Sequence, residues 1–286
     1  MKMTYKILIV LGMLLVLIVP ACTPAAEPAA ETESVATMAA LDKILEQGYF
    51  TYGLEAQYRP FEFRDEDDNI VGYDVDVADA IGRYLGVEAR PVDTSWGAVI
   101  QSLYDGQFDF ILGGMTATEQ RYERVDFSLP YMFAGSGLLI AADGGIGEVA
   151  DLDGKVVGAG EGTPSVWQLE VTAESMGLQY DGEIRTYDDD AAAYEAMKTG
   201  RIDAYASSQV SLMEFSKVES DFAVIPFVSA EWSEEWSCAA FRKEDAGFRA
   251  IVNGILIDMK ETGELAELQE KWFEQTFETS NVPPTW

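Results

Sequence analysis

The 286-residue chain contains no histidine, and this absence narrows the chemistry available to it. Without an imidazole it cannot assemble a histidine-based catalytic triad, use histidine as an acid or base, or build the common zinc sites. Cysteine is nearly as scarce, because only Cys22 and Cys238 occur. If Cys22 is consumed by a modification, no intrachain disulfide can form, and we expect Cys238 to be a buried small hydrophobic side chain. We therefore expect neither a metal site nor a cofactor.

Positive charge is also in short supply. The chain has 19 Lys and Arg residues against 50 Asp and Glu residues, which gives a formal net charge of −31. Such a field repels nucleic acid and anionic lipid, and it favours cationic neighbours or a high-salt habitat. We therefore expect no nucleic-acid partner.

The N-terminal hydrophobic run, residues 7–19, is too short for a comfortable membrane span. With Lys2 and Lys6 before it, this run is typical of an export signal. The segment that follows, Val19-Pro-Ala-Cys22, resembles a bacterial lipobox with an unusual proline. This resemblance implies a lipoprotein signal peptide at residues 1–21 and a diacylated Cys22 that anchors an exported protein to the outer face of the cell membrane or in the periplasm. A plain secretory signal cleaved at another position is the alternative.

Residues 22–40 are predicted to be a flexible tether. From Ala25 to about Thr37 the chain is rich in Ala, Pro, Glu and Ser and shows no periodicity. Such a segment cannot bury enough apolar surface to fold. The rest of the chain suits one large or two medium domains with a substantial core.

One pattern occurs twice, about a hundred residues apart. Leu103-x-x-Gly106-x-x-Asp109 and Met197-x-x-Gly200-x-x-Asp203 each join a helix-like stretch to an apolar run. The glycine suits the left-handed position that ends a helix, and the apolar run is typical of a buried strand. The repeat predicts two similarly built α/β units.

Helices alternate with short apolar strands, which favours open and mostly parallel sheets. The predicted helices are Asp76–Leu85, Ser95–Tyr104, Ser165–Glu174, Asp189–Lys198, Asp245–Thr262 and Glu264–Phe273. The predicted strands are Tyr49–Gly53, Ile70–Tyr73, Phe108–Leu112, Lys155–Ala159, Ile202–Ala206 and Phe222–Phe227.

The segment between Gly113 and Ser128, GGMTATEQRYERVDFS, is the most informative about function. It places glycine amides, two threonine hydroxyls and a helix start after a strand, and Thr118 suits the N-cap of that helix. Arg121 follows, and its planar guanidinium suits a carboxylate. In open α/β sheets, ligands bind beyond the carboxyl ends of the strands. The segment therefore indicates an anion site, although an ordinary strand–turn–helix with a surface salt bridge is the alternative.

Three acidic clusters are interpreted as structural. Residues 65–69 form an acidic run that could suggest a calcium loop of the EF-hand type. Such a loop needs glycine at its sixth position, where this chain has Ile70, so we expect a solvated hairpin turn. Asp74 and Asp76 open a helix, where negative charge is stabilising. Residues 188–190 are interpreted in the same way, as charges in the first turn of the predicted helix Asp189–Lys198.

A series of short motifs resembles the family 3 extracellular solute-binding proteins, the receptors of polar amino-acid ABC importers. The motifs are Tyr58-Arg-Pro-Phe-Glu-Phe63, Val71-Gly-Tyr-Asp-Val-Asp76, Ser95-Trp96, Thr118-Glu-Gln-Arg121, Asp126-Phe-Ser-Leu-Pro-Tyr131, Gly162-Thr163, Gly200-Arg-Ile-Asp203-Ala and Lys271-Trp-Phe273. Each motif is weak alone, and their order and spacing from about Leu41 to Phe273 make the resemblance specific.

The resemblance implies an α/β fold of the type II periplasmic-binding-protein kind, with two α/β lobes joined by two hinge strands. Lobe 1 is expected at residues 41–133 and 228–286, and lobe 2 at residues 134–227. Hinges are expected near Met132–Gly137 and Val224–Val228.

The resemblance also implies roles for particular residues. Arg121 would hold the carboxylate of the ligand, with Thr116, the region of Gly114, and the second-lobe pair Gly162 and Thr163. Tyr58 and Trp96 would cover the ligand side chain, and Glu55 would contact an amine or side chain. Where the family commonly has an aspartate that binds the ligand ammonium, this chain has Ser208. Either Glu55 or Glu161 takes the ammonium, or the ligand is not a simple α-amino acid, because a hydroxyl cannot neutralise a cation.

The resemblance therefore implies a monomeric receptor that captures a polar amino acid or related small carboxylate by hinge closure and delivers it to ABC permease subunits. The catalytic alternative is a cyclohexadienyl-dehydratase-like enzyme with Glu161 or Glu55 as its acid, which the lack of histidine disfavours. A sensory binding protein for a signalling receptor is a further alternative.

Overall fold

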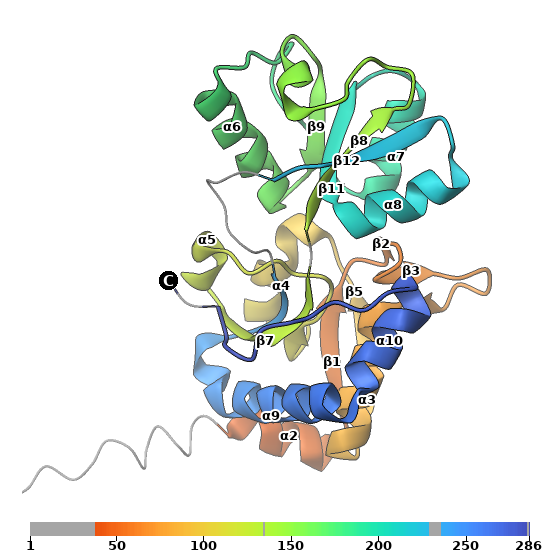
Figure 1. Cartoon of the computed structure of the whole chain (residues 1–286). Helices are drawn as coiled ribbons and strands as arrows, with labels where there is room; N and C mark the ends of the chain where they lie inside the picture. The colour runs from red at the N-terminus through yellow and green to blue at the C-terminus, as the bar shows by residue number, and fades with distance from the viewer. Residues whose placement is uncertain (1–37, 134, 229–235, 285) are drawn as a thin grey trace, which may run out of the picture.

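The structure, a computed structural model, describes residues 38–133, 135–228, 236–284 and 286. Two five-stranded sheets, each covered by helices, form two lobes, one above the other in Figure 1. The lobe 1 sheet has the order β5 (Glu88–Asp93), β1 (Tyr49–Leu54), β6 (Phe110–Ile111), β13 (Trp236–Phe241) and β7 (Asp126–Phe133). The lobe 2 sheet has the order β10 (Arg185–Tyr187), β9 (Val157–Gly160), β11 (Ala204–Ser208), β8 (Ser136–Ala141) and β12 (Phe222–Pro226).

Each sheet contains one strand that runs against the other four. In lobe 1 this strand is β13, which pairs antiparallel with β6 and β7; in lobe 2 it is β8, which pairs antiparallel with β11 and β12. The remaining pairings, β5–β1–β6 and β10–β9–β11, are parallel, as the alternating pattern predicted. Each of these two strands comes directly after the chain crosses from one lobe to the other. Each therefore enters its sheet from the end opposite to the one where the other four strands begin. The mixed α/β architecture confirms the predicted fold class.

The chain crosses between the sheets twice. It leaves lobe 1 at the end of β7 and enters lobe 2 with β8, and it leaves lobe 2 at the end of β12 and re-enters lobe 1 with β13. Lobe 1 is therefore built from two separate parts of the chain, and Figure 1 shows its C-terminal helices packed beside its N-terminal ones.

Helices cover both faces of the sheets (Figure 1). Lobe 1 has α2 (Ala39–Gln47), α3 (Tyr73–Leu85), α4 (Val99–Tyr104), α5 (Glu119–Tyr122), α9 (Ala246–Thr262) and α10 (Glu264–Phe273), with the 3-10 turns η1 (Trp96–Ala98) and η3 (Lys243–Asp245). Lobe 2 has α6 (Pro164–Met176), α7 (Asp190–Lys198) and α8 (Gln209–Val218), with η2 (Val149–Leu152). The sequence patterns predicted neither α2 nor α8. Among these described helices, none is both long and apolar enough to cross a membrane.

The predicted tether extends slightly too far. Ala39 and Ala40, which it included, lie in the first turn of α2. Leu41 and Ile44 are buried in the lobe 1 core and hold this helix in place. The predicted signal peptide, Cys22 and most of the tether lie outside the described residues.

The repeated motif has the same structural role in each lobe. Gly106 and Gly200 adopt left-handed backbone conformations, with φ of 74° and 65°, as predicted. The aspartate three residues later then receives a backbone amide from a neighbouring segment of the sheet. Asp109 accepts from the amide of Thr51 at 2.8 Å, and Asp203 accepts from that of Val156 at 2.8 Å. The motif therefore ties each helix–strand unit to its sheet.

A small third sheet lies on lobe 1 beside the second lobe. It consists of β2 (Gln57–Tyr58), β3 (Glu62–Arg64) and β4 (Ile70–Val71), all antiparallel. The acidic run between β3 and β4 is the predicted hairpin turn, because a carboxylate oxygen of Asp65 accepts the amides of Asp67 and Asn69. Phe61 and Phe63 are buried, and so is Cys238, as predicted for that side chain.

Candidate ligand-binding cleft

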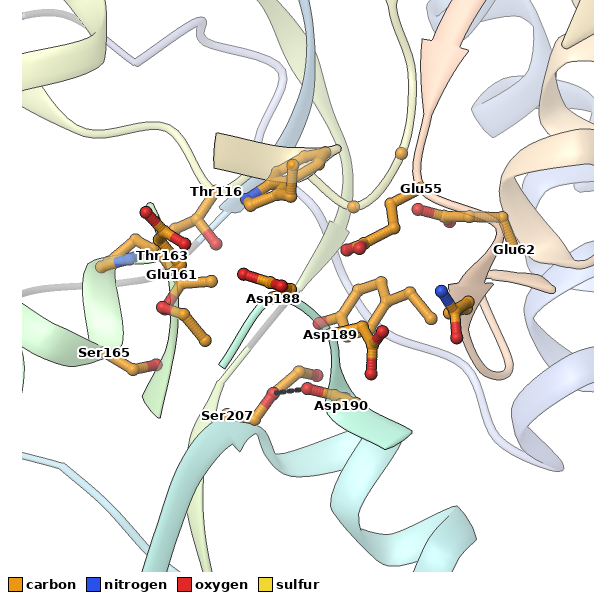
Figure 2. A pocket seen from close by; sticks show the side chains of 18 of the residues that line it. Glu55, Glu62, Thr116, Glu161, Thr163, Ser165, Asp188, Asp189, Asp190 and Ser207 are labelled. Carbon is orange, nitrogen blue, oxygen red and sulfur yellow. Dashed lines mark hydrogen bonds between the residues drawn. The ribbon is translucent and has the colours of Figure 1, made fainter. Parts of the chain in front are cut away.

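A cleft between the lobes gathers residues from the carboxyl ends of five strands. Glu55 follows β1, Gly113 and Gly114 follow β6, Glu161 follows β9, residues 188–190 follow β10, and Ser207 and Ser208 end β11. Figure 2 shows the labelled side chains from both lobes facing one space. Eight of the nine predicted ligand-binding residues line this cleft: Glu55, Tyr58, Trp96, Gly114, Thr116, Arg121, Thr163 and Ser208. The ninth, Gly162, contacts the guanidinium of Arg121 through its carbonyl oxygen.

Arg121 bridges the two lobes and has no carboxylate partner among the described residues. It extends from α5, and the hydroxyl of Thr118 caps this helix by accepting the Arg121 amide at 3.3 Å, as predicted. Its Nη1 donates to the carbonyl of Thr116 at 2.8 Å, and its Nη2 donates to the carbonyl of Gly162 at 2.8 Å. The guanidinium has five N–H donors, so these two bonds leave donors for a ligand. Burial lowers the pKa of Arg121 to about 10, and the group remains a cation at neutral pH.

The glycine turn does not supply the free amide that the sequence suggested. The amide of Gly114 donates to Asp74 Oδ2 and to the hydroxyl of Tyr131, so it is not available to an anion. Gly114 is required for another reason, because its φ is 58° and a Cβ would lie 2.8 Å from Cε1 of Tyr58. The expectation of a bare Gly114 amide is therefore wrong, and a role for the region of Gly114 in ligand binding stays a prediction.

Thr163 places a helix N-terminus at the lobe 2 side of the cleft. It is the N-cap residue of α6, and Pro164 occupies the first helical position. The Thr163 hydroxyl donates to the carbonyl of Gly160 at 2.7 Å, which orders the turn. Ser165, in the first turn of α6, also lines the cleft. The positive end of a helix beside Arg121 strengthens the attraction for an anion.

Two aromatic rings form part of the lobe 1 wall. Tyr58 stacks on Phe61, with ring centroids 4.9 Å apart and planes at 14°. The guanidinium carbon of Arg121 lies 5.5 Å from the centre of the Trp96 ring. Both rings line the cleft and are half-buried, so they are positioned to cover a ligand.

Acidic side chains face one another across the cleft. Glu55 stands on lobe 1, and Asp188, Asp189 and Asp190 stand on lobe 2 (Figure 2). Burial, together with the charges of Asp189 and Asp190, raises the pKa of Glu55 to about 8. None of these four carboxylates forms an ion pair with a described Lys or Arg residue. The described side chains of the cleft therefore offer one cation, Arg121, against several acids.

The interpretation of residues 188–190 as ordinary first-turn charges is wrong in part. Asp189 is the N-cap of α7 and accepts the amide of Ala192 at 2.7 Å, as a structural role requires. Asp190, however, is turned into the cleft wall, where hydroxyl groups surround it. This environment of Asp190 could not be predicted from local patterns, because the hydroxyls come from α7, β11 and α8.

Asp74 likewise has more than a helix-terminal role. Its carboxylate and that of Glu62 are both fully buried and interact directly, with no basic partner among the described residues. Burial raises the pKa of both carboxyl groups. Glu62 also lines the cleft, beside the glycine turn. In the described residues no group of His, Cys, Asp or Glu is arranged to hold a metal ion.

The chain matches a known protein family along most of its length. The model of the bacterial extracellular solute-binding proteins, family 3, matches residues 50–275. The chain belongs to this family. Membership places its site of action outside the cytoplasm.

Individual relatives agree with this assignment. The L-cystine-binding protein TcyJ of Escherichia coli (strain K12) is 32% identical over 243 residues, which cover 84% of this chain and 88% of that protein. The arginine-binding extracellular protein ArtP of Bacillus subtilis (strain 168) is 32% identical over 261 residues, 91% of this chain and 97% of that one. A crystal structure of a mutant of ArgBP from T. maritima matches with a TM-score of 0.73 and 35% identity, covering 82% of this chain and 100% of that chain. The chain is therefore a solute-binding protein rather than an enzyme.

Proposed function

We propose that the protein captures an amino acid in the interlobe cleft and delivers it to an ABC permease. The observation that carries this proposal is the guanidinium of Arg121, which lies between the lobes, has spare donors and contacts no carboxylate among the described residues. A ligand carboxylate would accept these donors in a charge-assisted pair. Each hydrogen bond to a charged group contributes roughly 1.5–3 kcal/mol, a large share of the about −8 kcal/mol that micromolar binding needs.

The same cleft favours a ligand that also carries positive charge. Glu55 and residues 188–190 line the same cleft as Arg121, and a buried carboxylate without a counter-charge is costly. A zwitterionic amino acid meets both needs, because its carboxylate faces Arg121 and its ammonium faces the acids. The names of the cystine-binding and arginine-binding relatives support this ligand class. Glu55, Tyr58, Trp96, Thr116, Thr163 and Ser208 would complete the site.

Closure of the two lobes would bury the ligand. We place lobe 1 at residues 39–133 and 228–286 and lobe 2 at residues 134–227, with the hinges where the chain passes between the two sheets. Ligand contacts made from both walls stabilise the closed form over the open form, which is what drives a hinge closure. We further propose that residues 1–21 are a signal peptide and that a lipid on Cys22 keeps the receptor beside its permease.

A thermal-shift screen of a soluble chain that starts after Cys22 tests the proposal. The screen covers the common amino acids, dicarboxylates and amine-free analogues of the amino acids. A ligand that binds the native state raises the unfolding midpoint, and at a hundred times its Kd it adds about 2.7 kcal/mol. We expect at least one amino acid to do so. If no amino acid shifts the midpoint while another solute does, the amino-acid assignment is wrong.

A further inference from the structure

The lobe 2 wall of the cleft has a hydroxyl, not a carboxylate, at the end of β11. Ser208 ends β11 there, and its hydroxyl oxygen is buried with no hydrogen-bond partner among the described residues. A hydroxyl can bond to an ammonium group but cannot neutralise it. The counter-charge must therefore come from a neighbouring side chain.

Asp190 lies on the same wall and is held in place by four hydroxyl groups. Its Oδ1 accepts from Tyr205 at 2.6 Å and from Ser207 at 3.4 Å (Figure 2 shows the second bond). Its Oδ2 accepts from Ser211 at 3.1 Å and from Tyr194 at 3.2 Å. These hydroxyls fix the position of the carboxylate, but they bring no positive charge. No described Lys or Arg residue forms an ion pair with Asp190.

The hydroxyl groups around Asp190 have one proton too few to bond all of their acceptors at once. The Oγ atom of Ser211 lies 2.7 Å from the carbonyl oxygen of Arg59 on lobe 1 and 3.1 Å from Oδ2 of Asp190. A serine hydroxyl has a single proton and cannot donate to both acceptors. When Ser211 bonds across the lobes to Arg59, Oδ2 of Asp190 can accept another donor. The Ser207 bond is long as well, so Oδ1 is only weakly satisfied.

The other acids of the cleft fit this role less well. Asp189 already caps α7 through the amide of Ala192. Asp188 and Glu161 are exposed, and Glu161 lies against Gly97 where the two lobes meet. Glu55 belongs to the opposite lobe, across the cleft from Ser208.

We propose that Asp190 supplies the counter-charge for the ligand's ammonium group, at the wall where Ser208 offers only a hydroxyl. The proposal rests on the proposed function, since it assumes an amine-bearing ligand whose carboxylate is held by Arg121. The hydroxyls of Tyr194, Tyr205, Ser207 and Ser211 position the carboxylate before the ligand arrives, which lowers the cost of ordering it on binding.

Binding of two matched ligand pairs to the soluble chain tests this assignment. The probes are L-arginine and L-cystine, each compared with its des-amino analogue, and affinities are measured by isothermal titration calorimetry. Asp190→Asn should weaken binding of the amino acid by roughly ten- to hundred-fold. It should change binding of the des-amino analogue by less than about threefold, because that ligand has no ammonium to lose.

Two further variants separate this role from a structural one. Asp143→Asn removes the same charge from an exposed carboxylate of lobe 2 outside the cleft, and it should alter the amine preference far less than Asp190→Asn does. Adding Ser208→Asp to Asp190→Asn returns a carboxylate to the wall, and it should restore at least part of the lost preference for the amine. A structural defect would weaken both ligand forms equally, and Ser208→Asp would not repair it.

The outcomes distinguish the two proposals. If the unmodified chain binds an amino acid and Asp190→Asn leaves its preference over the des-amino form unchanged, the role of Asp190 is overturned and the proposed function stands. If the unmodified chain binds des-amino ligands better than amino acids, both the amino-acid function and the role of Asp190 are overturned.

Discussion

The guanidinium of Arg121 donates a hydrogen bond of 2.8 Å to the carbonyl oxygen of Gly162, across the gap between the two lobes. A second hydrogen bond, also 2.8 Å, goes to the carbonyl of Thr116 on its own lobe. Carbonyl oxygens orient the guanidinium without neutralising it. The two bonds to carbonyl oxygens therefore hold a cation in a cleft whose other charged side chains, among the described residues, are acidic.

Arg121→Ala should reduce amino-acid affinity by roughly ten- to hundred-fold or more, because a charge-assisted bond to the carboxylate is lost. Arg121→Lys should retain part of the affinity, since it keeps the charge but loses the planar fork. Calorimetry measures the affinities, and circular dichroism checks the fold. Near-normal affinity in Arg121→Ala would refute the assignment of this residue to the ligand carboxylate.

Gly114→Ala should destabilise the protein by more than the about 1–2 kcal/mol expected for a left-handed backbone alone. The added Cβ would lie 2.8 Å from the ring of Tyr58, so that ring must move. Gly86→Ala is a matched control, because Gly86 has φ of 73° and no atom within 4 Å of its Cβ position. Urea denaturation compares the two free energies of unfolding. Equal losses in the two variants would show that the contact with Tyr58 has no energetic effect.

The pH dependence of stability should include a contribution from Glu55. Its folded-state pKa is raised to about 8, chiefly by burial, from an ordinary value of 4.5. Between these values the native state binds more protons than the unfolded state, so stability is highest below the lower value and falls as pH rises through the upper one. Glu55→Gln cannot ionise and should flatten this fall in the ligand-free protein. Thermal unfolding from pH 5 to 8 measures it, and an unchanged profile would contradict the assignment.

The two copies of the repeated motif should differ in their contribution to stability. Asp109 is buried and accepts the amide and hydroxyl of Thr51, at 2.8 and 3.0 Å, and Nζ of Lys43 at 3.0 Å. The carboxylate of Asp203 is exposed and accepts only the amide of Val156 among the described residues. Asp109→Asn should therefore cost about 2 kcal/mol, and Asp203→Asn about 1 kcal/mol or less. Chemical denaturation tests this order, and a larger loss at Asp203 would reverse the interpretation.

Local patterns predicted those parts of the fold whose causes lie close together in the sequence. The helix that ends at Phe273 was predicted with its bounds, and the one that ends at Leu85 was missed only in its first turn. The N-cap role of Thr118 and the turn at residues 65–69 follow from side chains that bond to backbone within a few residues. Helix α8 was missed because its amphipathic pattern is weak and it begins directly at the end of a strand.

The candidate site was also predicted in part. The order and spacing of the motifs selected Arg121, Tyr58, Trp96 and Thr163, and these residues line one cleft. The same motifs suggested that the Gly114 amide is free, but Asp74, forty residues earlier, accepts it. The buried partnership of Asp74 with Glu62 was missed for the same reason.

The sequence by itself determined the alternation of helices and strands, the absence of histidine chemistry, and which strand ends carry hydroxyls and an arginine. Those properties depend on residue type and on neighbours a few positions away. Only the tertiary structure decided that Asp190 sits among the hydroxyls of Tyr194, Tyr205 and Ser211, and that Arg121 reaches Gly162 of the other lobe. These contacts arise when strands and helices distant in the sequence pack together. Packing also decides which buried charges have a partner within the protein and which are left to pair with a ligand.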